Sequence, residues 1–159
     1  LAAAGAVGVN LEDGRADGSL AAVDVQSALG TAVKERVPSL FVNARTDTHW
    51  VGGHSIAEAE RRVRAYAAAG ADGVFVPGLA EPADVERIVA AGLPLNLLFL
   101  PGKVTVAGLA ELGVARISLG SLPYRMALAA AAEAARAVRD GRDLPLSPPS
   151  YADVVALLP

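Results

Sequence analysis

The sequence contains no cysteine and carries little charge. Without Cys the chain can form neither a disulfide nor a thiolate metal site, and it has no cysteine nucleophile. Charged residues make up 19% of the 159 positions and hydrophobic residues 53%, a composition typical of a packed chain and not of a disordered one. We therefore expect one sizeable domain with its own core.

Basic clusters and long apolar runs are also missing. The formal net charge is −3 and no stretch concentrates Lys or Arg, so neither nucleic acid nor an anionic membrane surface is an expected partner. Every apolar stretch is interrupted by Gly, Pro, Arg or Asn well before the roughly 18 residues that a transmembrane helix requires. The sequence also lacks a secretory signal pattern. These absences favour a soluble cytoplasmic protein.

What the sequence does contain is a repeated pattern of a helix-like stretch, a Gly and a short apolar run. Gly after a helix suits the left-handed position that ends it, and a run that is apolar on both alternations suits a parallel strand buried on both faces. Four segments show the pattern: AAAGAVGVNLEDG (2–14), AAAGADGVFVPG (67–78), VAAGLPLNLLFLPG (89–102) and AELGVARISLGS (110–121). A fifth segment, ERVPSLFVNARTD (35–47), has Pro38 in place of the Gly.

Helices are expected between these strands, giving the order β-α-β-α-β-α-β-α-β-α of an α/β fold with a parallel sheet. Ser55 and Glu58 have the spacing of a capping box, and Pro82 suits a first helical turn. The expected helices are 56–69, 83–91, 104–112 and 122–140, followed by a short one over 151–158. Residues 1–145 are expected to form one domain, and 146–159 a Pro-rich break with the short C-terminal helix.

Polar residues gather at the ends of the strands, where parallel α/β folds carry their ligand sites. Arg45 is a guanidinium in an apolar layer, and it suits either a carboxylate or phosphate ligand or an ion pair with Asp47 or Glu12. Glu12 and Asp13 are adjacent, so their side chains point to opposite faces. They could hold a hard cation such as Mg²⁺, although a solvated loop is the commoner reading of such a pair.

Weaker candidates follow along the chain. Asn96 is an amide among apolar residues, which indicates a ligand contact or a hydrogen-bonded core amide. His49 and His54 flank a Gly-containing loop but have no third metal ligand at a suitable spacing, so we interpret them as incidental. Ser118 and Ser121 could bind a phosphate at a helix start, and ordinary helix capping explains them equally well.

Taken in order, five motifs resemble the isocitrate lyase/phosphoenolpyruvate mutase superfamily, particularly its shorter, mutase-like members. The resemblance implies a (β/α)₈ TIM barrel, a homo-oligomer (dimer or tetramer) and chemistry on small carboxylates through an enolate-like form. The motifs are GVNLEDG (8–14), FVNARTD (41–47), AYAAAGADGVFVPG (65–78), LPLNLL (93–98) and GVARISLGSLPYR (113–125).

The resemblance also implies roles for individual residues. Glu12 would belong to a site for Mg²⁺, or Mn²⁺ in its place, through a bridging water. Arg45 would bind the substrate carboxylate or phosphoryl group and offset developing charge. Asn96 and Asn43 would contact the substrate. The expected activity is that of a carbon–carbon lyase acting on a small 2-oxo or 2-hydroxy di- or tricarboxylate.

Two departures keep alternatives open. The loop that carries a catalytic Cys in the lyase branch reads GRADGSLAAVD (14–24) here, without Cys and without the Lys and Asn of the mutase branch. P–C chemistry of the mutase or phosphonopyruvate hydrolase kind is therefore one alternative. The chain also supplies five strands where a barrel has eight, so we expect it to represent the last five βα units. A non-catalytic fragment or pseudoenzyme that serves as a binding or assembly module is the other alternative.

Overall fold

The computed structural model describes residues 2–53 and 55–157, which form two compact units divided between residues 119 and 120. Among the described residues, none of the helices combines the length and apolarity that a bilayer-spanning segment requires.

The first unit is a five-stranded parallel sheet in which a helix follows each of the first four strands. The strands are arranged in chain order, β1 to β5, so every connection is a βα crossover to the adjacent strand. The prediction of an α/β fold with parallel strands is confirmed. A short 3₁₀ helix (Ala2–Ala4) precedes β1 (Gly8–Glu12), α1 (Val23–Arg36), β2 (Phe41–Arg45), α2 (Ile56–Ala68), β3 (Gly73–Phe75), α3 (Pro82–Val89), β4 (Leu95–Leu98), α4 (Val106–Glu111) and β5 (Arg116–Ser118).

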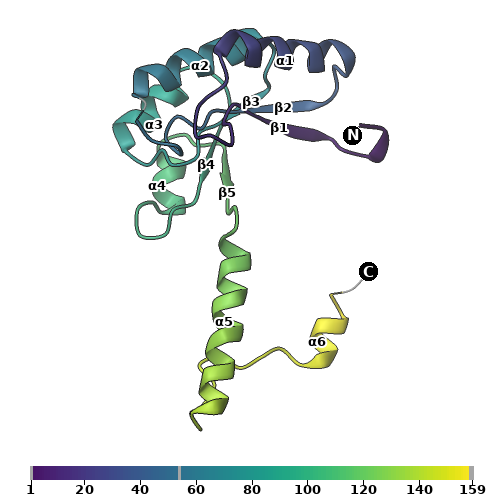
Figure 1. The fold of residues 1–159 in the computed structure, drawn as a ribbon, viewed down its shortest axis with the longest axis vertical. Helices are drawn as coiled ribbons and strands as arrows, with labels where there is room; N and C mark the ends of the chain where they lie inside the picture. Colours follow the sequence, from purple (N-terminus) through teal and green to yellow (C-terminus); the bar gives the residue numbers. More distant parts are fainter. Residues whose placement is uncertain (1, 54, 158–159) are drawn as a thin grey trace. The chain divides into compact units, whose positions relative to one another are not determined.

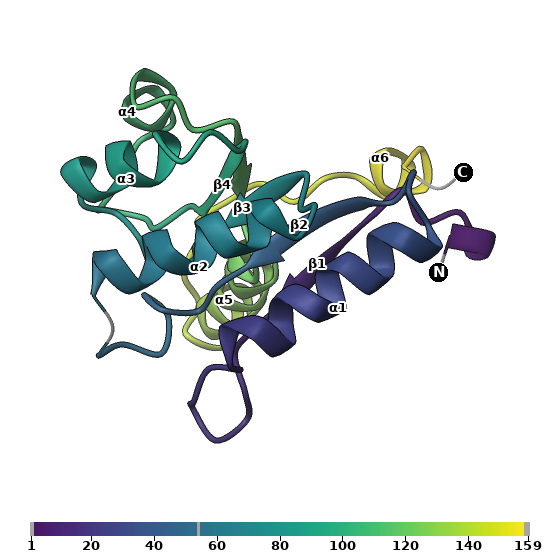
Figure 2. The same ribbon diagram turned by 90° about the horizontal axis from the view of Figure 1, so that it is seen from above.

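One face of this sheet is covered by the helices α1 to α4, which Figures 1 and 2 show side by side along it. The apolar core lies between the sheet and these helices. Its buried members are Ala59, Val63, Val74, Val76, Leu79, Val85, Ile88, Leu95, Leu97 and Leu109. Alternate strand residues point to opposite faces, so the residues between these core positions point to the other face of the sheet.

The ends of the helices follow the local sequence. Gly70 and Gly113 come directly after helices and have φ of 91° and 81°, a left-handed conformation that favours glycine. Ser55 caps α2 by accepting a hydrogen bond from the Glu58 N–H at 3.3 Å. The predicted capping box is only half formed, because the Glu58 carboxylate pairs with Arg61 and Arg62 instead of reaching back to Ser55.

The second unit contains α5 (Leu122–Arg139) and α6 (Tyr151–Val155). Ser150 and Asp153 form a complete capping box at the start of α6. Ser121 precedes α5 without a side-chain capping bond, so capping does not account for it, and Ser118 lies in β5 instead of at a helix start. Large apolar side chains are exposed along this unit: Tyr124, Met126, Leu128, Val138, Leu146, Tyr151, Val155 and Leu157.

Candidate active site

The carboxyl ends of β1 and β2 bring Glu12 and Arg45 together. The two strands are parallel and in register, and Glu12 pairs with Arg45 across them, so both side chains leave the same face of the sheet at the same level. Arg45 Nη1 lies 3.0 Å from Glu12 Oε2. Arg45 also donates from Nε to Asp47 Oδ1 at 2.7 Å and from Nη2 to Asp47 Oδ2 at 3.2 Å. Asp47 therefore holds the guanidinium through two hydrogen bonds along its Nε and Nη2 side, and Glu12 forms an ion pair with Nη1.

This arrangement fixes the guanidinium without exhausting its donors. Its carbon lies 5.5 Å from the centre of the Phe75 ring, which adds a cation–π contact from β3. A guanidinium has five N–H groups, and the contacts to Glu12 and Asp47 account for three of them, which leaves two. The Arg45 side chain keeps 22% of its surface exposed. The ion pair considered from the sequence is thus present, and it leaves donors for an anionic ligand.

Glu12 lies in surroundings that disfavour its negative charge. Partial burial, a hydrogen bond with the Asp47 carboxyl and the charges of Asp47 and Asp13 raise the pKa of Glu12 above 4.5, although Arg45 opposes the rise. The Glu12 side chain is 47% exposed and accessible to an ion. A cation beside it would relieve this repulsion.

Glu12 is the kind of accessible carboxylate that could serve as a single magnesium ligand. Mg²⁺ commonly keeps several waters and binds through one or two carboxylates together with the substrate. Over residues 2–53 and 55–157, no group of three or more His, Asp or Glu side chains is arranged to hold a metal. The role of Glu12 at a metal site, through a bridging water, therefore stays a prediction.

Asp13, next to Glu12, points away from this face, as the alternation along a strand predicts. It is 1% exposed, and its carboxylate lies 2.9 Å from Arg62 Nη1 and accepts the Tyr66 hydroxyl at 2.7 Å. The interpretation of the acidic pair as a solvated loop is therefore wrong for Asp13. Both side chains that pair with it come from α2, which sequence spacing alone did not connect with β1.

Asn96 and Asn43 are both buried on the face that carries Arg45. Asn96 Nδ2 donates to Ser118 Oγ at 3.0 Å, and the same hydroxyl lies 3.1 Å from Asn96 Oδ1. Asn43 Nδ2 donates to Asn10 Oδ1 at 2.7 Å. Each amide thus has a protein partner, and each retains one N–H for a further acceptor. Their contact with substrate stays a prediction.

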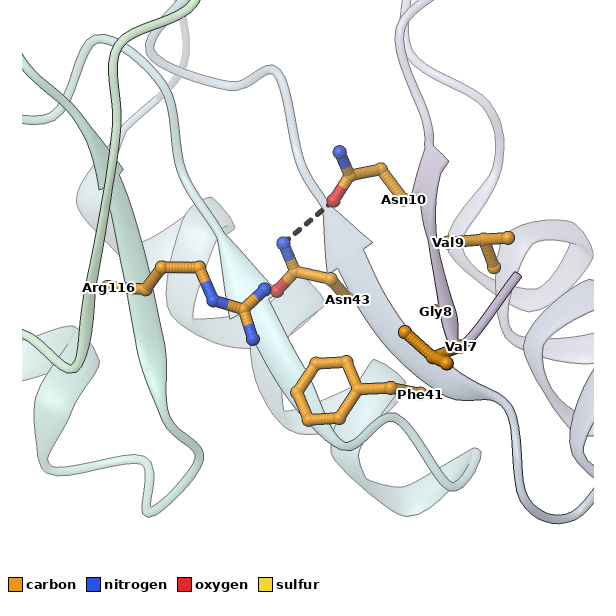
Figure 3. A pocket seen from close by; sticks show the side chains of 7 residues that line it. All are labelled: Val7, Gly8, Val9, Asn10, Phe41, Asn43 and Arg116. Atoms are coloured by element: carbon orange, nitrogen blue, oxygen red, sulfur yellow. Dashed lines mark hydrogen bonds between the residues drawn. The ribbon is translucent and has the colours of Figure 1, made fainter. Parts of the chain in front are cut away.

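Arg116 is a second cation on this face, and it was not among the site residues predicted from the sequence. Arg116 of β5 lies with its guanidinium carbon 4.9 Å from the centre of the Phe41 ring. It lines a pocket of about 460 Å³ together with Asn43, Val7 and residues 8–10 of β1 (Figure 3). An Arg inside a predicted apolar strand was the available signal, the same signal that singled out Arg45.

The loop after β2 is fixed by local contacts. Thr48 Oγ1 lies 3.1 Å from His49 Nδ1, and Gly78 approaches the His49 carbonyl so closely that a Cβ at position 78 would overlap it. His54 lies outside the described residues.

The comparisons with known proteins agree with the fold. A family model described as phosphoenolpyruvate phosphomutase matches residues 1–139. The chain is 46% identical over 157 residues to an uncharacterized protein of Mycobacterium tuberculosis (strain ATCC 25618 / H37Rv), covering 95% of this chain and 58% of that protein. It is 33% identical over 133 residues to an oxaloacetate decarboxylase of Ectopseudomonas mendocina (strain ymp), covering 79% of this chain and 44% of that enzyme.

The structural match is equally clear. The crystal structure of a candidate phosphonomutase from Burkholderia cenocepacia J2315 superposes with a TM-score of 0.78 at 41% identity, over 88% of this chain and 60% of that one. The chain thus spans less than two thirds of the length of these proteins. The matches cover nearly the whole of the chain itself, and this chain belongs to the phosphoenolpyruvate mutase/isocitrate lyase superfamily.

Proposed function

We propose that this chain carries the substrate-clamping part of a Mg²⁺-dependent lyase-type enzyme that cleaves a C–C bond in a small 2-oxo or 2-hydroxy di- or tricarboxylate. The observation that carries the proposal is Arg45, held at the carboxyl end of β2 by Asp47 and Glu12 with two N–H groups left for a ligand. The similarity to an oxaloacetate decarboxylase supports a small 2-oxo acid as the substrate class.

Arg45 would bind the substrate carboxylate and stabilise negative charge as an enolate-like form develops. A guanidinium already fixed by Asp47 needs no reorganisation at that moment, which is the condition under which such groups contribute most. Asn96 and Asn43 would orient the substrate through their remaining amide hydrogens. Glu12 would hold Mg²⁺ through water, and the bound ion would supply positive charge that polarises a substrate oxygen.

P–C bond chemistry is the second candidate, and the similarity to a candidate phosphonomutase favours it. A guanidinium fork suits a phosphoryl group as well as a carboxylate. A substrate panel with Mg²⁺ separates the two activities. Pyruvate or glyoxylate released from a carboxylic acid supports the lyase, whereas phosphate released from phosphonopyruvate supports the alternative. The exposed Arg64→Ala, whose guanidinium lies 3.8 Å from Glu60, is a matched control for Arg45 variants.

A non-catalytic binding or assembly module is the third candidate, favoured by the Cys-free loop over residues 14–24. Mg²⁺-dependent binding of oxalate, a mimic of an enolate, would argue against it. Turnover of none of the panel substrates, together with no oxalate binding, would support it.

We further propose a cytoplasmic homo-oligomer, a dimer or tetramer, in which residues 1–145 belong to one barrel-type domain and 146–159 to a separate C-terminal segment. The exposed Tyr124, Met126 and Leu128 support association, because exposed apolar side chains gathered on one helix mark interaction surfaces.

A further inference from the structure

Asp13 is a buried carboxylate with every partner it needs. Its Oδ1 accepts the backbone N–H of Asp47 at 2.8 Å, and its Oδ2 accepts Tyr66 Oη at 2.7 Å and Arg62 Nη1 at 2.9 Å. Arg62 and Tyr66 are themselves buried. A carboxylate taken out of water is costly unless it is paired and hydrogen-bonded, so three donors at 1% exposure indicate a built arrangement.

Arg62 connects this carboxylate to the rigid part of the first unit. Arg62 Nε donates to Glu58 at 2.7 Å, and its Nη1 also donates to the Ala21 carbonyl at 2.9 Å. Arg62 lies on α2 between Ala59 and Val63, both of which are fully buried in the core. The donors that hold Asp13 are therefore fixed by core packing and are not free to follow a moving loop.

Asp47 connects Asp13 to the candidate active site. Its backbone N–H is bound to Asp13, and its side chain, only 3% exposed, is bound to Arg45. Gly14 leaves room for this carboxylate, because a Cβ at position 14 would overlap Asp47 Oδ2. The contacts therefore run without a gap from α2 through Asp13 and Asp47 to the Arg45 guanidinium.

The geometry points to Asp13 as a positioning residue, held by Arg62 and Tyr66, that sets the Arg45 guanidinium through the backbone of Asp47. The inference rests on the proposed function, in which Arg45 is the group that touches substrate. A displacement of about 1 Å in a positioned group can cost on the order of 10²-fold in rate, so the placement of Asp47 has a functional effect. No residue of this arrangement other than Arg45 needs to contact the ligand.

Tyr66→Phe is the most selective test, because it removes one hydroxyl donor to Asp13 and keeps the buried ring. Two readouts are needed. The first is the NMR signal of the Arg45 Nε–H, which donates to Asp47 and reports the clamp without any ligand. The second is Mg²⁺-dependent oxalate affinity. Tyr151→Phe, whose side chain is exposed, is the matched control.

We expect Tyr66→Phe to shift the Arg45 Nε–H signal, to speed its exchange with water about tenfold, and to weaken oxalate binding by a factor of about 3–10. In an Arg45→Ala background the same substitution should weaken oxalate binding no further. A second variant, Asp13→Asn, should shift the Arg45 Nε–H signal more than Tyr66→Phe does, since it removes the negative charge that pairs with Arg62.

An unchanged Arg45 Nε–H signal in folded Tyr66→Phe would overturn the positioning role. An equal loss of oxalate affinity with and without Arg45 would also overturn it, because it indicates a general structural effect. If the signal responds as expected but the wild-type protein binds no oxalate, the proposed function fails while the coupling of Asp13 to Arg45 stands.

Discussion

Arg45 and Asp47, two residues apart in the chain, form a side-on ion pair in which Nε lies 2.7 Å from Oδ1 and Nη2 lies 3.2 Å from Oδ2. Asp47 is buried, whereas Arg45 retains some exposure. The carboxylate is therefore a fixed support and the guanidinium the accessible member of the pair. This asymmetry is what a substrate clamp requires, and it decides which substitutions test the site.

Arg45→Lys should reduce turnover by about 10²–10³-fold, because a lysine keeps the charge but loses the planar fork and its bidentate contacts. Arg45→Ala is a less selective variant, since it leaves the buried Asp47 carboxylate without its cation, and it should also lower the free energy of unfolding by about 3 kcal/mol. Steady-state kinetics and urea unfolding measure the two effects. Full turnover in Arg45→Lys, with Arg64→Lys as control, would remove the guanidinium from the mechanism.

Glu12→Gln should weaken Mg²⁺ binding by about 10–100-fold, measured by titration calorimetry in the presence of oxalate. It should not lower the melting temperature near pH 7, because a folded-state pKa raised above 4.5 means that ionised Glu12 opposes folding there. That opposition is relieved as pH falls through the raised pKa, so any stability gain of the variant should shrink on acidification. A loss of stability at neutral pH, absent in the control Glu81→Gln, would mean that Glu12 is a structural group.

Asp72 gives a prediction about acid stability. Burial acts to raise the pKa of Asp72, but the Val42 N–H at 2.8 Å and Lys34 Nζ at 2.9 Å outweigh it, so this pKa lies below 3.8. A carboxyl group whose pKa is lowered in the folded state stabilises the fold at any pH above its unfolded-state pKa. This contribution is lost as pH falls through the lowered, folded-state pKa. Asp72→Asn should cost about 1 kcal/mol at pH 7 and almost nothing in strong acid.

Urea unfolding of wild type and Asp72→Asn across pH 2–7 measures this difference. The exposed Asp143→Asn is a suitable control. If the difference in unfolding free energy between wild type and Asp72→Asn stays constant down to the lowest pH, the charge of Asp72 does not produce that difference.

The apolar side chains of α5 predict association in solution. Light scattering of the wild-type protein should give a mass of two or four times 16.1 kDa. Replacing Tyr124 and Leu128 together by Glu should shift the protein toward the monomer, because these two exposed side chains lie four residues apart on one face of α5 and charge opposes the burial of that face. Val25→Glu, at an exposed apolar position of α1, should leave the mass unchanged. A wild-type protein that is monomeric at every concentration would contradict the proposed oligomer.

The sequence predicts the order of elements well because each βα unit is punctuated locally. Gly or Pro marks the start of each strand, and the apolar runs identify strands buried on both faces. The same pattern located Glu12 and Arg45 at strand ends, and the parallel register then placed them side by side. These features depend on neighbours in the chain or on adjacent strands, which periodicity encodes.

Contacts between residues far apart in the sequence could not be predicted from these local patterns. Arg62 and Asp13 are 49 residues apart, and nothing in the periodicity of α2 distinguishes a buried Arg from the solvated Arg61 and Arg64 beside it. The contact of Arg116 with Phe41 likewise depends on how the strands incline across the sheet. Such contacts are determined by tertiary packing, so the support behind Arg45 emerged only from the structure.

The most direct test of the account is the dissociation constant of oxalate, measured by titration calorimetry with and without Mg²⁺ in the wild-type protein and in Arg45→Lys. We predict Mg²⁺-dependent binding in the wild type, at least tenfold weaker binding in Arg45→Lys, and unchanged binding in the surface control Arg64→Lys. Equal oxalate affinity in wild type and Arg45→Lys, or no Mg²⁺-dependent binding in either, would contradict Arg45 as the substrate clamp.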